Sequence, residues 1–145
     1  MTLHAAYDPE NIFAKILRGD MPNVTVYEDD TVLAFMDVFP QSDGHTLVIP
    51  KHIQARNLLD MPPNHLGSYM LKVQKVARAV EVGLKPDGVV ITQFNGGVAG
   101  QTVFHLHFHI IPRWHGVPLG RHSSGEMADM DKLQELATQI KAGLN

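Results

Sequence analysis

Cysteine is absent from the 145-residue chain. Its absence excludes disulfide bonds, zinc sites built on thiolates and a cysteine nucleophile. Because nothing in the composition points to an oxidising compartment, we expect a cytoplasmic protein.

Positive charge is also scarce, since 12 lysines and arginines face 15 aspartates and glutamates, for a formal net charge of −3. No basic footprint for a nucleic acid is present. Residues 1–7 lack the apolar stretch of a signal peptide, and no apolar run approaches membrane-spanning length. We therefore expect a soluble protein that binds neither nucleic acid nor membrane.

The spacing of apolar residues predicts a helix, three strands, a long helix, two strands and a final helix. A chain of this length is one ordinary domain, which we expect to span residues 1–145. Short connections between these elements favour an α+β fold with a five-stranded, mainly antiparallel sheet. The predicted helices are 8–17, begun by Asp8 and stopped by Gly19, 63–84, and one capped by Asp129; the predicted strands are 24–28, 31–36, 45–49, 89–94 and 102–111.

Histidine is abundant, with nine copies, and three of them alternate in the predicted strand 102–111. Side chains in a strand point to opposite faces in turn, so His105, His107 and His109 share one face. Polar residues that fill the solvent face of a strand are one explanation. Such faces normally mix Thr, Lys, Glu and Ser, so three imidazoles favour chemistry.

A metal site is one chemical alternative, because histidines at positions i and i+2 can chelate zinc. His105 and His109 would lie roughly 13 Å apart at Cα in a strand, too far for one ion to take all three ligands. A two-histidine site would need a further ligand such as His45 or His52.

Nucleophilic catalysis is the other alternative, since an imidazole with a reference pKa of about 6.5 is largely neutral at pH 7 and can attack phosphorus. The preceding segment Gly100-Gln101-Thr102 ends a glycine-rich loop, residues 95–101. Such a loop can direct backbone N–H groups and a hydroxyl at an anion.

The run from Gly100 to Ile111 resembles the signature of the histidine triad superfamily, in which histidines alternate with apolar residues. Four upstream segments, in the same order, resemble its nucleotide-binding Hint branch. The resemblance covers a core of about residues 10–113 and leaves the C-terminal loop and helix, 114–145, unplaced. The four segments are 12–16, 27–30, 35–37 and 44–51.

This resemblance implies a HIT-like α+β fold in which two subunits join their sheets, and a pocket for a purine nucleoside monophosphate. His107 would attack the α-phosphorus to give a covalent nucleotidyl-histidine, which water then hydrolyses. His109 would contact the phosphate and help to protonate the leaving group, with His45 beside it. His105 would orient the nucleophile through its backbone carbonyl.

The resemblance also implies contacts to the nucleotide. Asp37 matches the position that binds the ribose hydroxyls, and Asn95, Gly100 and Thr102 match phosphate-contacting positions, with Gln101 in the same loop. Positions around the base are matched by Ile12, Phe13, Ile16, Met21, Phe35 and Val38.

Two features depart from the pattern. Some bacterial members carry a Cys-x-x-Cys pair that helps to bind structural zinc, where this chain has Asn11 and Ala14, so we expect no such zinc. Ile111-Pro112-Arg113 stands where animal Hint proteins have Gly-Gly-Arg. The Gln-Thr-Val before the triad also occurs in the branch that cleaves dinucleoside polyphosphates.

We therefore expect a homodimeric purine nucleoside phosphoramidase that uses neither cofactor nor metal. Dinucleoside polyphosphate hydrolysis with the same nucleophile is one alternative. A nucleotide-responsive binding protein with vestigial hydrolysis is another.

Overall fold

A five-stranded antiparallel sheet in the strand order β1-β2-β3-β5-β4 forms the centre of the protein. The structure is a computed structural model that describes residues 3–120 and 126–145. The predicted α+β fold with an antiparallel sheet is confirmed. The strands are β1 (Thr25–Glu28), β2 (Val32–Met36), β3 (Thr46–Pro50), β4 (Gly88–Thr92) and β5 (Phe108–Arg113).

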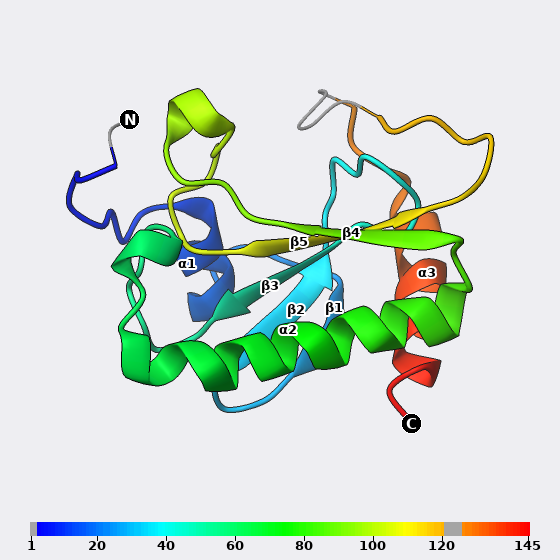
Figure 1. The fold of residues 1–145 in the computed structure, drawn as a ribbon, viewed down its shortest axis with the longest axis horizontal. Coiled ribbons are helices and arrows are strands. Elements are labelled where there is room, and N and C mark those ends of the chain that lie inside the picture. The colour runs from blue at the N-terminus through cyan, green and yellow to red at the C-terminus, as the bar shows by residue number, and fades with distance from the viewer. Residues whose placement is uncertain (1–2, 121–125) are drawn as a thin grey trace.

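The two faces of the sheet are covered unequally (Figure 1). Helices α2 (Pro63–Leu84) and α3 (Met130–Ala142) pack on one face, and α2 has the bounds predicted from its apolar spacing. The seven-residue helix α1 (Ile12–Arg18) packs on the other face, against a smaller cluster of buried side chains. Because α1 is short, part of this second face stays accessible.

The central strands bring two distant polar residues together. Every residue of β2 and β3 is buried, and Met36 pairs with Thr46 at the end of their ladder. Asp37 and His45 therefore meet at the mouth of the connecting loop, where Asp37 N donates to the His45 carbonyl over 2.9 Å.

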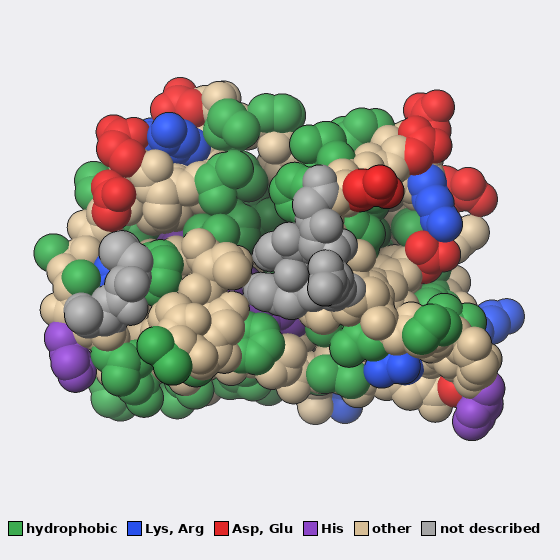
Figure 2. All heavy atoms as spheres, turned by 90° about the horizontal axis from the view of Figure 1, so that it is seen from above, with side chains coloured by type: hydrophobic (Ala, Val, Ile, Leu, Met, Phe, Trp, Pro, Cys, Tyr) green, Lys and Arg blue, Asp and Glu red, His purple; other side chains and the backbone are tan. Residues whose placement is uncertain are grey.

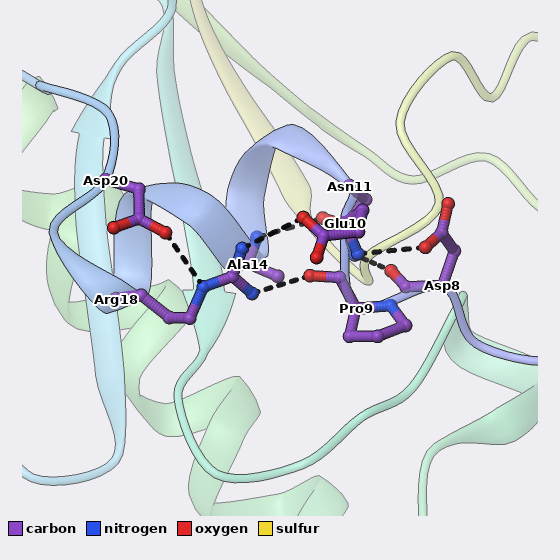
Figure 3. Close-up of polar contacts among 7 residues, drawn as sticks. All are labelled: Asp8, Pro9, Glu10, Asn11, Ala14, Arg18 and Asp20. Atoms are coloured by element: carbon purple, nitrogen blue, oxygen red, sulfur yellow. Dashed lines mark hydrogen bonds and ion pairs between the residues drawn. The ribbon is translucent and has the colours of Figure 1, made fainter.

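The N-cap of helix α1 lies three residues later than the sequence predicts (Figure 3). Its N-cap is Asn11, whose side chain accepts a hydrogen bond from Ala14 N. Asp8, the predicted cap, instead accepts from Glu10 N and, through its carbonyl, from Asn11 Nδ2. The predicted stop is confirmed, since Gly19 adopts the left-handed conformation with φ 84°. The short polar side chain nearest the helix thus outcompetes the earlier carboxylate.

Strand β5 is also displaced from its predicted bounds of 102–111. It begins at Phe108, so His105 and His107 precede the strand, and it continues through Pro112 to Arg113. Proline is tolerated there because β3 pairs with β5 only as far as Ile110. Pro112 therefore pairs with β4 alone, as a residue of an edge strand would.

Helices α2 and α3 approach each other closely at a glycine. A Cβ placed on Gly83 would collide with the backbone carbonyl of Gln139 in α3.

In the described part of the chain, no helix has both the length and the apolar composition needed to cross a bilayer.

We predict that Gly83→Ala destabilises the protein by about 1–3 kcal/mol, because the clash with α3 outweighs the higher helix propensity of alanine. The matched control is Gly67→Ala in the same helix, where the added Cβ meets nothing within 4 Å. That variant should gain up to about 1 kcal/mol. Urea unfolding of both variants measures the difference, and equal effects would contradict the close helix contact.

Candidate active site

The three alternating histidines lie on the face of the sheet opposite α2. Leu106, Phe108 and Ile110 pack into the core beside α2, so the predicted alternation holds although the strand starts late. His105, His107 and His109 are all buried, at 1%, 6% and 2% exposure. They therefore do not form a solvated strand face. Buried polar atoms usually have a hydrogen-bond partner, so the surroundings of each ring nitrogen matter.

His107 is held in one tautomer by the main chain. Its Nδ1 lies 2.7 Å from the His105 carbonyl oxygen. Because a carbonyl oxygen can only accept, Nδ1 carries the proton, and in the neutral ring the lone pair is then on Nε2. The ring also packs edge-on against Phe13, with centroids 4.9 Å apart.

His105 is fixed in the opposite tautomer. Its Nε2 donates to the Pro50 carbonyl over 3.0 Å, and its Nδ1 accepts from the Tyr7 hydroxyl over 2.6 Å. Burial lowers the pKa of His105 to about 4, so this ring is neutral at pH 7. Its contribution to the site is therefore positional.

His45, His109 and Asp37 form a buried polar corner at the end of the β2–β3 loop. Gln41 N donates to His45 Nδ1 over 3.0 Å, which places the His45 proton on Nε2. That Nε2 lies 2.9 Å from His109 Nδ1 and 3.4 Å from Asp37 Oδ2. Burial raises the pKa of Asp37 to about 6, so its carboxylate is charged at pH 7 at an energetic cost.

This corner is a group of three residues with ligand atoms close enough to hold a metal, all within 4.8 Å of one another. A histidine that binds metal through Nε2 must protonate Nδ1 and usually donates that proton to an acceptor. At His45, however, Nδ1 faces the N–H of Gln41, which is a donor. The donor set fits a hydrogen-bonded unit better than a metal centre.

The pocket beside the histidines has a volume of about 640 Å³. It opens between α1, the sheet and residues 127–130, and in Figure 2 hydrophobic side chains border a hollow in the surface. Ten of the predicted site residues line it: Ile12, Phe13, Ile16, Met21, Phe35, Asp37, Val38, Thr102, His107 and His109.

The remaining predicted residues are not among those that line this pocket. Gln101 is buried and braces the loop, because its amide accepts from Gly96 N and donates to the carbonyls of Arg56 and Val103. Asn95 Oδ1 accepts from Leu58 N and from the side chain of Gln93, so any contact to a ligand would come from its amide nitrogen.

Gly100 ends the short 3-10 turn Gly97–Ala99 with φ 109°, a conformation that favours glycine. The nucleotide-binding roles expected of these loop residues stay predictions.

The family model of the HIT domain matches residues 18–116. The chain belongs to the HIT domain family. This confirms the predicted membership of the histidine triad superfamily, with Hint-like character.

Among curated relatives, the HIT protein hit of Bacillus subtilis is 47% identical over 71% of this chain and 70% of its own length. Adenylylsulfatase HINT3 of Arabidopsis thaliana is 38% identical over 77% of this chain, which spans only 59% of that protein.

Two solved HIT structures cover nearly the whole chain. A Hit-like protein from Bartonella henselae, described as involved in cell-cycle regulation, has 48% identity and a TM-score of 0.89, covering 96% of this chain and 99% of its own. A histidine triad nucleotide-binding protein from Sulfolobus tokodaii has 31% identity and a TM-score of 0.82, with coverages of 91% and 90%.

Several residues of the HIT pocket carry no signal in the local sequence. Met127 and Met130 line it from a segment that the sequence left unplaced, anchored where Ala128 N donates to the Val38 carbonyl. Tyr7 reaches His105 from 98 positions away. Neither residues 1–7 nor the chain entering the final helix has a local pattern that could reveal such contacts.

We predict that Asp37→Asn stabilises this HIT protein more at pH 7.5 than at pH 4. The change in the free energy of unfolding should be about 2 kcal/mol more favourable at the higher pH. The folded pKa of Asp37, about 6, lies above the ordinary unfolded value, so ionisation costs stability. Stability attributable to protonated Asp37 is therefore present below about pH 4 and lost as pH rises through about 6. Urea unfolding at the two pH values measures this difference.

The control for this prediction is Asp30→Asn, which removes an exposed carboxylate from the β1–β2 turn. An equal pH-dependent gain in that variant would contradict assignment of the effect to the burial of Asp37.

Proposed function

We propose that this chain is a purine nucleoside phosphoramidase that hydrolyses a phosphorus–nitrogen bond through a covalent nucleotidyl-histidine. The observation that carries the proposal is the His107 tautomer. Its Nδ1 proton is committed to the His105 carbonyl, so the lone pair on Nε2 is the nucleophile at the pocket wall. A neutral, oriented imidazole is the form that can attack phosphorus.

In the first step, His107 Nε2 bonds to the α-phosphorus and the phosphorus–nitrogen bond breaks. The departing amine takes a proton from His109. His45 supports His109 in this role, because its Nε2 lies 2.9 Å from His109 Nδ1. Asp37, 3.4 Å from His45 Nε2, favours an extra proton on this histidine pair by its negative charge. In the second step, water attacks the adduct and returns a proton to the pair, which releases the monophosphate and restores His107.

The leaving group also follows from the charge of the pocket. Within residues 3–120 and 126–145, no lysine or arginine lines it, and Asp37 contributes negative charge. An amine leaves as a neutral molecule once protonated, whereas a sulfate or nucleotide leaving group carries negative charge that this lining does not compensate. The lining therefore favours a phosphoramidate over a dinucleoside polyphosphate.

Adenylyl sulfate is the second candidate substrate, because a relative with 38% identity is named an adenylylsulfatase. Sulfate is a much weaker base than an amine and can leave without taking a proton. The two reactions would use the same nucleophile but depend differently on the His45–His109 pair.

We predict that the purified protein releases AMP from adenosine 5′-monophosphoramidate with EDTA present, and faster than from diadenosine polyphosphate or adenylyl sulfate. His107→Ala should bind AMP but lose at least about a thousandfold in turnover, together with the covalent adduct. Chromatography of released AMP and mass spectrometry of acid-quenched protein measure both.

The matched control is His65→Ala, which removes an exposed histidine of α2. Turnover in His107→Ala like that of the wild type would remove His107 from the nucleophile role. Activity that EDTA abolishes and zinc restores would favour metal catalysis, and AMP binding without product from any of the three substrates would favour a binding protein.

We also propose a homodimer in which the sheets of two subunits join at β4. This strand ends the sheet with β5 as its neighbour, and its Val90 and Ile91 are 39% and 47% exposed. An edge strand with exposed apolar side chains is a natural surface for strand pairing. The cytoplasmic location and the single-domain organisation stay predictions.

Ile91→Lys is expected to convert the dimer to a monomer by placing charge in the proposed contact, as measured by sedimentation velocity. Val98→Lys is the control, since Val98 is fully exposed in the glycine loop outside β4. A wild-type monomer, or an Ile91→Lys dimer, would contradict joining at β4.

A further inference from the structure

Tyr7 contacts the histidine row from outside the part of the chain that matches the HIT domain. It precedes α1, and its hydroxyl donates to His105 Nδ1 over 2.6 Å, with the two rings edge-on at a centroid distance of 5.7 Å. Burial raises the pKa of Tyr7, so the hydroxyl keeps its proton throughout the physiological range. The direction of this hydrogen bond is therefore fixed.

The bond matters because His105 lies before β5, where no sheet ladder holds its backbone. The backbone is anchored at the next residue, where Leu106 N donates to the Ala55 carbonyl. The His105 ring supplies the other anchors, to Pro50 through Nε2 and to Tyr7 through Nδ1. The position of the His105 carbonyl, which accepts from His107, depends on these anchors.

Arg56 ties the same two segments together next to this contact. It is 1% exposed, donates from Nη1 to the Ala6 carbonyl, and places its guanidinium 4.8 Å from the centre of the Phe104 ring. Ala6 precedes Tyr7 and Phe104 precedes His105. A single buried side chain thus holds the residues before both partners of the hydrogen bond.

We propose that Tyr7 is a positioning residue for the nucleophile: its hydroxyl fixes the ring of His105 and, through the His105 carbonyl, the tautomer and orientation of His107. The catalytic part of this statement rests on the proposed function. The positional part concerns the histidine rings themselves and is measurable without turnover.

The test uses Tyr7→Phe in the full chain, which keeps the ring and removes the hydroxyl. With its Nδ1 donor gone, His105 keeps its Nε2–H bond to the Pro50 carbonyl but loses its second anchor. The His105 Nδ1 signal should therefore shift, and the Nδ1–H form of His107 should become less uniform. Long-range ¹H–¹⁵N correlations of histidine-labelled protein report both rings. We expect kcat for adenosine 5′-monophosphoramidate to fall about tenfold while the dissociation constant of AMP changes less than about twofold.

Tyr27→Phe is the matched control, because the Tyr27 hydroxyl donates to Asp29 over a similar 2.7 Å on another part of the sheet. It should leave the His105 and His107 signals and kcat unchanged. Thermal unfolding of both variants separates positioning from a general loss of stability.

Unchanged His107 signals in Tyr7→Phe would overturn the inference, and so would a wild-type kcat despite altered signals. If the wild-type protein hydrolyses none of the three substrates, the proposed function fails on its own. The tautomer of His107 in Tyr7→Phe then still decides whether Tyr7 positions that ring.

Discussion

A buried imidazole holds one tautomer only when each ring nitrogen meets a partner of the right polarity, and the site depends on this constraint. The backbone carbonyl of His105 decides where the proton of His107 lies, and the backbone N–H of Gln41 decides the same for His45. Main-chain groups cannot change their polarity, so the alternation of donor and acceptor is built into the fold itself. These main-chain donors and acceptors therefore determine which nitrogen of each histidine carries a proton.

The β2–β3 hairpin is buried under helices on both faces, and it brings together two residues of the buried polar corner. Its register brings Asp37 and His45 to one point, and the loop between them wraps the imidazole with its own backbone. The cost is a carboxylate that ionises in a largely buried place, which the raised pKa of Asp37 reflects. A site that needs a charge beside a histidine pair accepts this loss of stability.

Local sequence patterns predicted those parts of the structure that local physics determines. Apolar spacing predicted the bounds of α2, and strict alternation predicted that the three histidines share a face even though β5 starts at Phe108. The start of β5 depends on where β3 offers a partner, which no local pattern encodes. The start of α1 was predicted wrongly because Asp8 and Asn11 can both cap a helix. The local sequence does not show which of the two does so.

The sequence also grouped ten residues that line one pocket, but it gave no sign of Met127, Met130 or Tyr7. These contacts join segments about 90 or more positions apart and arise from packing alone. The resemblance to a family covered about residues 10–113, and Tyr7 and both methionines lie outside that stretch.

The two methionines in the pocket wall have a consequence for how such a protein can diverge. Met127 and Met130 lie where the chain enters α3, next to the bond from Ala128 N to Val38, whereas the hydrogen bonds that set the histidine tautomers lie elsewhere in the chain. Substitutions in the wall can therefore reshape what the pocket admits without disturbing the groups that react. Selectivity and reactivity are free to evolve at separate rates.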